Sequence, residues 1–113
     1  LAVHLDGARL GNALVHTGAS PAQMTWKAGV DALSLGLTKT GAIGCEIIML
    51  FGRARAKFQE LRIRAKRSDH MPAKMRYLSA QAEAMLTGDL WLSLSAEANR
   101  KARDLAGVFV GLG

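Results

Sequence analysis

Short apolar runs alternate with segments of helical character in the first half of the chain. Residues 1–5, 30–37 and 45–51 are largely apolar runs of strand length, and the last has the strongest β-propensity. Residues 7–16 carry apolar side chains on one helical face, and residues 20–29 open on a helix-start signal. The pattern predicts three buried strands, with two short helices between the first strand and the second.

The expected helix boundaries come from residues with known preferences at helix ends. Gly18 stands where the first helix is expected to end. Ser20 and Pro21 stand where the second helix begins, as its N-cap and first helical residue. Residues 38–44 contain two glycines and are predicted to form a loop between the second and third strands.

Apolar residues recur at helical spacing in the second half of the chain. We expect helices over residues 53–66, around residues 75–85 and after Gly88, with Asp89 as the cap of the last helix. Each apolar stripe marks one face of its helix, and in the 113-residue chain by itself we expect helix stripes to be left uncovered. The stripes are Phe58, Leu61 and Ala65; Met75, Leu78, Ala82 and Met85; and Leu94, Ala98, Ala102, Leu105 and Phe109.

This order of elements predicts an α/β fold. Helices between buried strands favour a layered arrangement with some parallel pairing, whereas the closely spaced second and third strands are compatible with either direction. The 113 residues, half of them hydrophobic, are enough for one modest core. Because the chain lacks an initial Met and ends just after a helical pattern, we interpret it as an internal piece of a longer protein.

Composition limits the covalent links, the cellular location, the partners and the metal sites that are expected for the protein. The single cysteine, Cys45, excludes an intrachain disulfide framework, is predicted to be a small buried residue, and is compatible with a cytoplasmic location. No apolar run reaches membrane-spanning length, so no membrane partner is expected. His4, His16 and His70 are too scattered for a metal site.

A dense basic stretch over residues 53–67 contributes to the formal net charge of +6. Such a stretch is typical of a nucleic-acid-binding helix, of a solvated helix face or of a phosphate-facing surface. Only Phe58 interleaves it with an aromatic ring, and that ring belongs to the apolar stripe. We therefore predict no nucleic-acid partner.

Two residues have the chemistry and the placement of a cofactor site. Asp6 ends the first predicted strand, and Lys39 follows the second by a short loop. Pyridoxal phosphate needs a lysine amine for its aldehyde and an anion beside its pyridine nitrogen. Arg9, about one helical turn after Asp6, is suited to a substrate carboxylate. Taken singly, such an aspartate is more often a helix cap or a turn residue. Such a lysine is usually a solvated loop residue, and such an arginine is usually an exposed residue at a helix start.

The ordered motifs around these residues resemble one family. Residues 4–10 (HLDGARL) resemble the strand–turn–helix of threonine aldolases and related β-eliminating lyases. Residues 33–41 (LSLGLTKTG) resemble the lysine segment of the bacterial low-specificity L-threonine aldolases. Residues 64–70, 74–81 and 89–92 resemble downstream helices of that subgroup, in the same order.

The resemblance implies a fold, a cofactor and a domain arrangement. It implies a pyridoxal-phosphate enzyme with an aspartate-aminotransferase-like fold, in which residues 1–88 are part of the large cofactor-binding domain. Residues 89–113 are then a helix leading toward a small C-terminal domain. Members of the family act on small amino acids as homodimers or homotetramers with sites shared between subunits.

The resemblance also implies residue roles. Lys39 holds the cofactor covalently, Asp6 pairs with the pyridine nitrogen, and Thr38 contacts the cofactor. Arg9 binds the substrate carboxylate. The candidate for a neighbouring subunit's phosphate is Arg76, followed by Lys66 and Arg67.

The implied reaction is the cleavage of β-hydroxy-α-amino acids, such as threonine, to glycine and an aldehyde. Another pyridoxal-phosphate lyase or racemase on the same scaffold, and a basic nucleic-acid-binding module, stay open as alternatives. The loop after Lys39 reads TKTGAIG over residues 38–44, whereas many relatives outside the subgroup have SKGLGAP, so its shape is open. By itself the 113-residue chain is expected to be inactive, because the family's phosphate loop is not within it.

Overall fold

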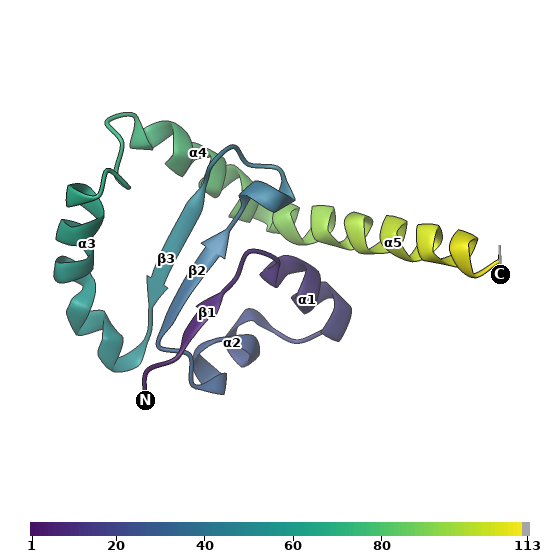
Figure 1. The fold of residues 1–113 in the computed structure, drawn as a ribbon, viewed down its shortest axis with the longest axis horizontal. Coiled ribbons are helices and arrows are strands. Elements are labelled where there is room, and N and C mark those ends of the chain that lie inside the picture. The colour runs from purple at the N-terminus through teal and green to yellow at the C-terminus, as the bar shows by residue number, and fades with distance from the viewer. Residues whose placement is uncertain (112–113) are drawn as a thin grey trace.

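A three-stranded sheet with helices beside it forms the centre of the molecule (Figure 1). The computed structural model describes residues 1–111. Strands β1 (His4–Asp6), β2 (Ala32–Gly36) and β3 (Glu46–Leu50) lie in the order β1-β2-β3. β1 and β2 are parallel, as predicted. The sequence left the relative direction of β2 and β3 open, and these two strands are antiparallel. The predicted α/β class is confirmed.

The helices follow the predicted order, with short 3-10 turns between several of them. The α-helices are α1 (Leu10–Thr17), α2 (Pro21–Met24), α3 (Phe58–Arg67), α4 (Met75–Leu86) and α5 (Leu90–Val110). The 3-10 turns are η1 (Trp26–Ala28), η2 (Thr38–Thr40), η3 (Gly52–Lys57) and η4 (Thr87–Asp89).

Most of the residues expected at the ends of α1 and α2 are found there. Gly18 ends α1 in the left-handed conformation, with φ of 69°, and its N–H donates to the carbonyl of Leu14. Ser20 caps α2 through a reciprocal capping box with Gln23. The expected start of α1 at residue 7 is wrong, because Gly7 N–H still donates to the Ser34 carbonyl of β2 at 2.8 Å.

One face of the sheet forms the core. Leu33 and Leu35 of β2 alternate with Ser34 and Gly36, so the leucines share the face that α1, α4 and α5 cover. Leu37, just after β2, is completely buried in the same cluster. The other cluster members are Leu10, Leu14, Ala42, Cys45, Met85 and Trp91.

The apolar stripe of α3 is uncovered within residues 1–111, in agreement with the expectation for the 113-residue chain. Residues 52–57 form the 3-10 turn η3 rather than the start of an α-helix, and α3 has no buried residue. In the stripe of Phe58, Leu61 and Ala65, Phe58 is 55% exposed and Leu61 is 36% exposed. Helical spacing places these side chains on one face, but within residues 1–111 no core lies against that face.

The predicted stripe of α5 is buried only near its N-terminus. Trp91 and Ser95 are its buried residues, whereas residues 101–110 are all exposed. Figure 1 shows this second half extending beyond the sheet. Asp89 does not act as a side-chain cap and has a left-handed φ of 58°. None of the described helices combines the length and apolarity that crossing a membrane requires.

Helix α4 packs on the segment between β2 and β3. Met85 is buried, and Leu78 and Ala82 pack against the core, but Met75 is 37% exposed. The thiol of Cys45 is buried and donates to the carbonyl of Leu78 at 3.3 Å. Burial, and to a smaller extent the neighbouring Glu46, raises the pKa of the Cys45 thiol.

The two tryptophans differ in burial. Trp91 is 6% exposed and belongs to the core. Trp26 is 51% exposed and packs on Phe51 with ring centroids 5.4 Å apart. Both rings therefore take part in packing, but only Trp91 lies in the core cluster.

Two glycines in helices provide a test of the packing between α1 and α5. A Cβ on Gly11 would lie 2.5 Å from Ser95 Oγ, whereas a Cβ on Gly107 meets nothing within 4 Å. We expect Gly11→Ala to lower the free energy of unfolding by about 1–3 kcal/mol through overpacking. Gly107→Ala is expected to raise it by up to about 1 kcal/mol through helix propensity. Urea unfolding of both variants measures this, and equal effects would contradict the close approach.

Candidate functional site

The parallel strands β1 and β2 end at the same edge of the sheet. Asp6 is the last residue of β1 and lies opposite Ser34 of β2. β2 ends at Gly36, and Lys39 follows three residues later (39 − 36 = 3) within η2. The carboxyl edge of such strands is where ligands bind in open α/β sheets. The fold therefore brings the Asp6 and Lys39 segments to one edge.

The carboxylate of Asp6 is held by its own turn. Its Oδ1 accepts a hydrogen bond from the N–H of Ala8 at 3.0 Å. Gly7 allows the turn to lie against β2, because a Cβ there would be 2.7 Å from Leu33 Cδ1 and 2.9 Å from the Ser34 carbonyl. The turn leads directly to Arg9, whose side chain is exposed just before α1.

A second polar pair lies on the same face as Asp6. His4 Nε2 and Ser34 Oγ share a hydrogen bond of 2.8 Å. His4 and Asp6 are two residues apart on β1, so their side chains project from the same face. Ser34 was not predicted as a site residue, although a polar residue within an apolar run was a signal for it.

The segment that carries Lys39 is anchored on both sides. Before it, the buried Leu37 donates its N–H to the Cys45 carbonyl at 3.0 Å and accepts from Ala42 N–H at 3.1 Å. After it, Ile43 N–H donates to Gln81 Oε1 of α4 at 2.7 Å. These contacts give the loop between β2 and β3 a defined shape while Lys39 itself stays exposed.

Lys39 lines an open cavity of about 280 Å³ between η2, α1 and α5. Asp6 is not part of its lining, and no hydrogen bond or ion pair within residues 1–111 joins Lys39 to Asp6 or Arg9. The structure thus places both segments at one edge, with Asp6 on the uncovered face and Lys39 beside α5. The other lining residues are Asn12, Thr40, Leu94, Ser95, Glu97, Ala98 and Lys101.

The remaining predicted site residues lie on the surface. Thr38 is exposed in η2, next to Lys39. Arg76, in the first turn of α4, has its guanidinium 5.0 Å from the ring centre of Tyr77 and donates to its hydroxyl at 3.3 Å. Lys66 and Arg67 are exposed at the end of α3. The structure describes no contact between these residues and Asp6.

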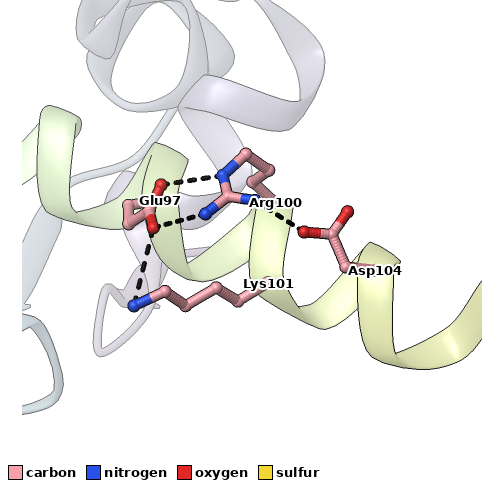
Figure 2. Close-up of polar contacts among 4 residues, drawn as sticks. All are labelled: Glu97, Arg100, Lys101 and Asp104. Atoms are coloured by element: carbon pink, nitrogen blue, oxygen red, sulfur yellow. Dashed lines mark hydrogen bonds and ion pairs between the residues drawn. The ribbon is translucent and has the colours of Figure 1, made fainter.

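A charged cluster on α5 borders the cavity (Figure 2). Arg100 donates to both carboxylate oxygens of Glu97, at 2.9 and 2.7 Å, and to Asp104 at 2.6 Å. Lys101 Nζ lies 3.5 Å from Glu97 Oε1. The hydrogen bonds from Arg100 are the main reason that the pKa of Glu97 falls to about 2. Spacings of three and four residues between opposite charges were the available sequence signal.

Within the described part of the chain, no group of three or more His, Cys, Asp or Glu side chains could hold a metal ion. Asp6, Lys39 and Arg9 bring a carboxylate, an amine and a guanidinium to neighbouring segments of this edge. That set suits a ligand with an aldehyde, a basic nitrogen or a carboxylate.

Comparison with known proteins agrees with this chemistry. Residues 1–111 match the beta-eliminating lyase family. The chain is 43% identical over 106 residues to a low specificity L-threonine aldolase of Pseudomonas aeruginosa, covering 94% of this chain and 30% of that protein. A protein of the same name from a Pseudomonas species is 41% identical with the same coverage.

The match over nearly the whole sequence assigns this chain to a class of lyases, and it belongs to the beta-eliminating lyase family. The resemblance to the low-specificity L-threonine aldolases predicted from the motifs is confirmed. The chain spans about 30% of the length of these relatives.

The low pKa of Glu97 predicts how its ion pairs depend on pH. The folded-state pKa, about 2, lies below the ordinary value of 4.5, so the stabilisation is present above about pH 4.5 and is lost as the pH falls through about 2. The difference in free energy of unfolding between wild type and Glu97→Gln should shrink over that range. It should be small throughout, because the cluster is exposed.

Urea unfolding at several pH values measures this difference. Glu83→Gln is the matched control, because Glu83 is an exposed glutamate on α4 with no ion pair among the described residues. A difference for Glu97→Gln that did not change with pH would contradict the ion-pair geometry.

Proposed function

We propose that this chain supplies the cofactor lysine and the pyridine-nitrogen partner of a pyridoxal-phosphate-dependent enzyme that cleaves β-hydroxy-α-amino acids such as threonine. The observation that carries the proposal is the placement of Asp6 and Lys39 at one carboxyl edge of the β1–β2 pair. Membership of the beta-eliminating lyase family and likeness to proteins named low specificity L-threonine aldolase support it.

The residues at this edge fit the cofactor's chemical groups. Lys39 is exposed and its amine has no hydrogen-bond partner among residues 1–111, so it is accessible to an aldehyde. Asp6 uses Oδ1 in its own turn and has no described partner at Oδ2, so one oxygen is free for a pyridine nitrogen. When bound, pyridoxal phosphate supplies an electron sink for negative charge that develops at the substrate α-carbon.

Each side chain then has a distinct task. Asp6 keeps a proton at the pyridine nitrogen through its negative charge, and its turn keeps the carboxylate from rotating away. Lys39 holds the cofactor covalently through Nζ, and Thr38 contacts it beside the lysine. Arg9 binds the substrate carboxylate through two parallel hydrogen bonds. Arg76, with Lys66 and Arg67 behind it, reaches a phosphate in a neighbouring subunit.

The overall reaction divides the substrate into two products, an aldehyde and glycine. The substrate's β-hydroxyl loses its proton, the Cα–Cβ bond breaks, and an aldehyde leaves. The α-carbon then gains a proton, which gives glycine. The side chains of this chain hold the substrate by its carboxylate and keep the positive charge at the pyridine nitrogen during these steps.

The larger context of the chain is also a proposal. We assign residues 1–88 to the large domain of an aspartate-aminotransferase-like fold and residues 89–113 to a helix leading toward a small domain. Residues 112 and 113 lie outside the described part. The exposed residues 101–110 of α5 support this assignment. The full protein is a cytoplasmic homodimer or homotetramer that takes small amino acids and has no nucleic-acid or membrane partner.

Replacement of Lys39 tests the proposed cofactor attachment. In the full-length protein, Lys39→Ala should abolish the visible absorption band of lysine-bound cofactor and lower threonine cleavage by at least about a thousandfold. Lys27→Ala removes an exposed lysine in η1 and should change neither. Survival of the band in Lys39→Ala would refute the assignment.

Product analysis with threonine and with an amino acid carrying a β-leaving group separates aldol cleavage from elimination or racemisation.

Replacement of Arg9 tests the proposed substrate contact. Arg9→Ala should raise KM for threonine by about ten- to a hundredfold, because a charge-assisted double hydrogen bond to the carboxylate is lost. Cofactor absorption should stay unchanged, since Asp6 and Lys39 remain. Arg103→Ala, an exposed arginine on α5, is the control. An unchanged KM for Arg9→Ala would reject this role.

A further inference from the structure

Two asparagines join α1 to α5 beside the cavity that Lys39 lines. Asn12 Nδ2 donates to Asn99 Oδ1 at 2.9 Å, and Asn99 Nδ2 donates to the main-chain carbonyl of Asn12 at 2.9 Å. Asn12 Nδ2 also lies 3.4 Å from the Ser95 carbonyl. Because Asn99 both donates and accepts, its amide constrains the rotation and the axial shift of one helix against the other.

The two helices approach closely at this pair. A Cβ on Gly11 would lie 2.5 Å from Ser95 Oγ and 3.1 Å from Trp91 Cε3, so α1 has no room to move toward α5. Ser95 is 2% exposed and its hydroxyl donates to the Trp91 carbonyl at 2.8 Å. The amide pair therefore acts at a packed contact, where a small shift of one helix is transmitted to the other.

Helix α1 carries Arg9. The carbonyl of Arg9 accepts the N–H of Ala13 at 3.2 Å, so the arginine moves with the first turn of α1. Asp6 differs, because its strand is hydrogen-bonded to β2 independently of α1. The position of Arg9 thus depends on how α1 sits, whereas the position of Asp6 depends on the sheet.

Helix α5 is the other wall of the Lys39 cavity. Ser95 and Lys101 of α5 line it together with Lys39, and Asn12 of α1 completes the same lining. The segment of Lys39 is held separately by the buried Leu37. α5 is therefore the common partner of the arginine-bearing helix and of the lysine-bearing turn.

We propose that the Asn12–Asn99 pair is a positioning device that sets Arg9, and with it the substrate carboxylate, relative to Lys39. The inference rests on the proposed function, because it gives Arg9 and Lys39 their substrate and cofactor. Among the described residues, neither asparagine side chain is hydrogen-bonded to Asp6, Arg9 or Lys39. Their effect passes through the docking of α1 on α5.

The expected signature is a change in substrate binding at constant cofactor loading. In the full-length enzyme, Asn99→Ala raises KM for L-threonine about tenfold, with a smaller change in kcat. The absorption band of the lysine-bound cofactor stays unchanged, since the sheet and Leu37 hold Asp6 and Lys39. A purely stabilising contact would lower the resistance to urea but leave KM of the folded enzyme unchanged.

A double-variant cycle tests whether the two residues act through each other. Asn12→Ala raises KM in the same direction, and the double variant is no worse than Asn99→Ala alone. Ser93→Ala is the control, because it removes a hydrogen bond from α5 to the Asp89 carbonyl of η4 without touching α1, and it should leave KM unchanged. Where the alanine variant does not fold, Asn99→Asp keeps the acceptor for Asn12 and should give an intermediate KM.

Amide hydrogen exchange separates this inference from the proposed function. In the cofactor-free full-length protein, Asn99→Ala should speed exchange in residues 10–17 about tenfold and leave residues 32–36 unchanged. Unchanged exchange in α1, additive KM effects, or a wild-type KM in Asn99→Asp would each overturn the positioning role. If the wild-type enzyme does not cleave threonine, the proposed function is refuted. The exchange measurement still shows whether Asn99 holds α1 against α5, because it does not depend on activity.

Discussion

Parallel pairing of β1 with β2 is the constraint on which the arrangement of this edge depends. It sets Asp6 opposite Ser34 and lets both strands end at the edge where Lys39 follows. A shift of one residue in this register would turn Asp6 toward the core and Leu5 toward the uncovered face. Leu5 opposes that shift, because its side chain would lose its packing against the core cluster.

Helix α5 is one continuous helix whose two halves lie in different environments. Its N-terminal half buries Trp91 and Ser95 against α1, whereas residues 101–110 contact no core within the described residues. The exposed half keeps its helical form with the help of the ion pairs between Arg100, Glu97 and Asp104. The helix thus forms one wall of the Lys39 cavity and continues beyond it (Figure 1).

The placement of the candidate residues was predictable where it is local. Asp6, Arg9 and Lys39 could be placed at a strand end, a helix start and a loop because the signals around each of them are contiguous in sequence. Two contacts were not predictable. The hydrogen bond of His4 with Ser34 spans 30 residues, and that of Asn12 with Asn99 spans 87. The spacing of apolar residues along the chain does not tell which residues that are far apart in the sequence come into contact in the fold.

The sequence by itself determined the order of strands and helices, their turn signals such as Gly18 and Ser20, and the α/β class, because these follow from local backbone preference. Only the tertiary structure decided the antiparallel pairing of β3 and which apolar stripes are buried. Spacing tells which side chains share a helix face, as for Phe58 in α3, but burial depends on whether another element covers that face. For the same reason, packing alone decided that Lys39 lies beside α5 while Asp6 lies on the uncovered face.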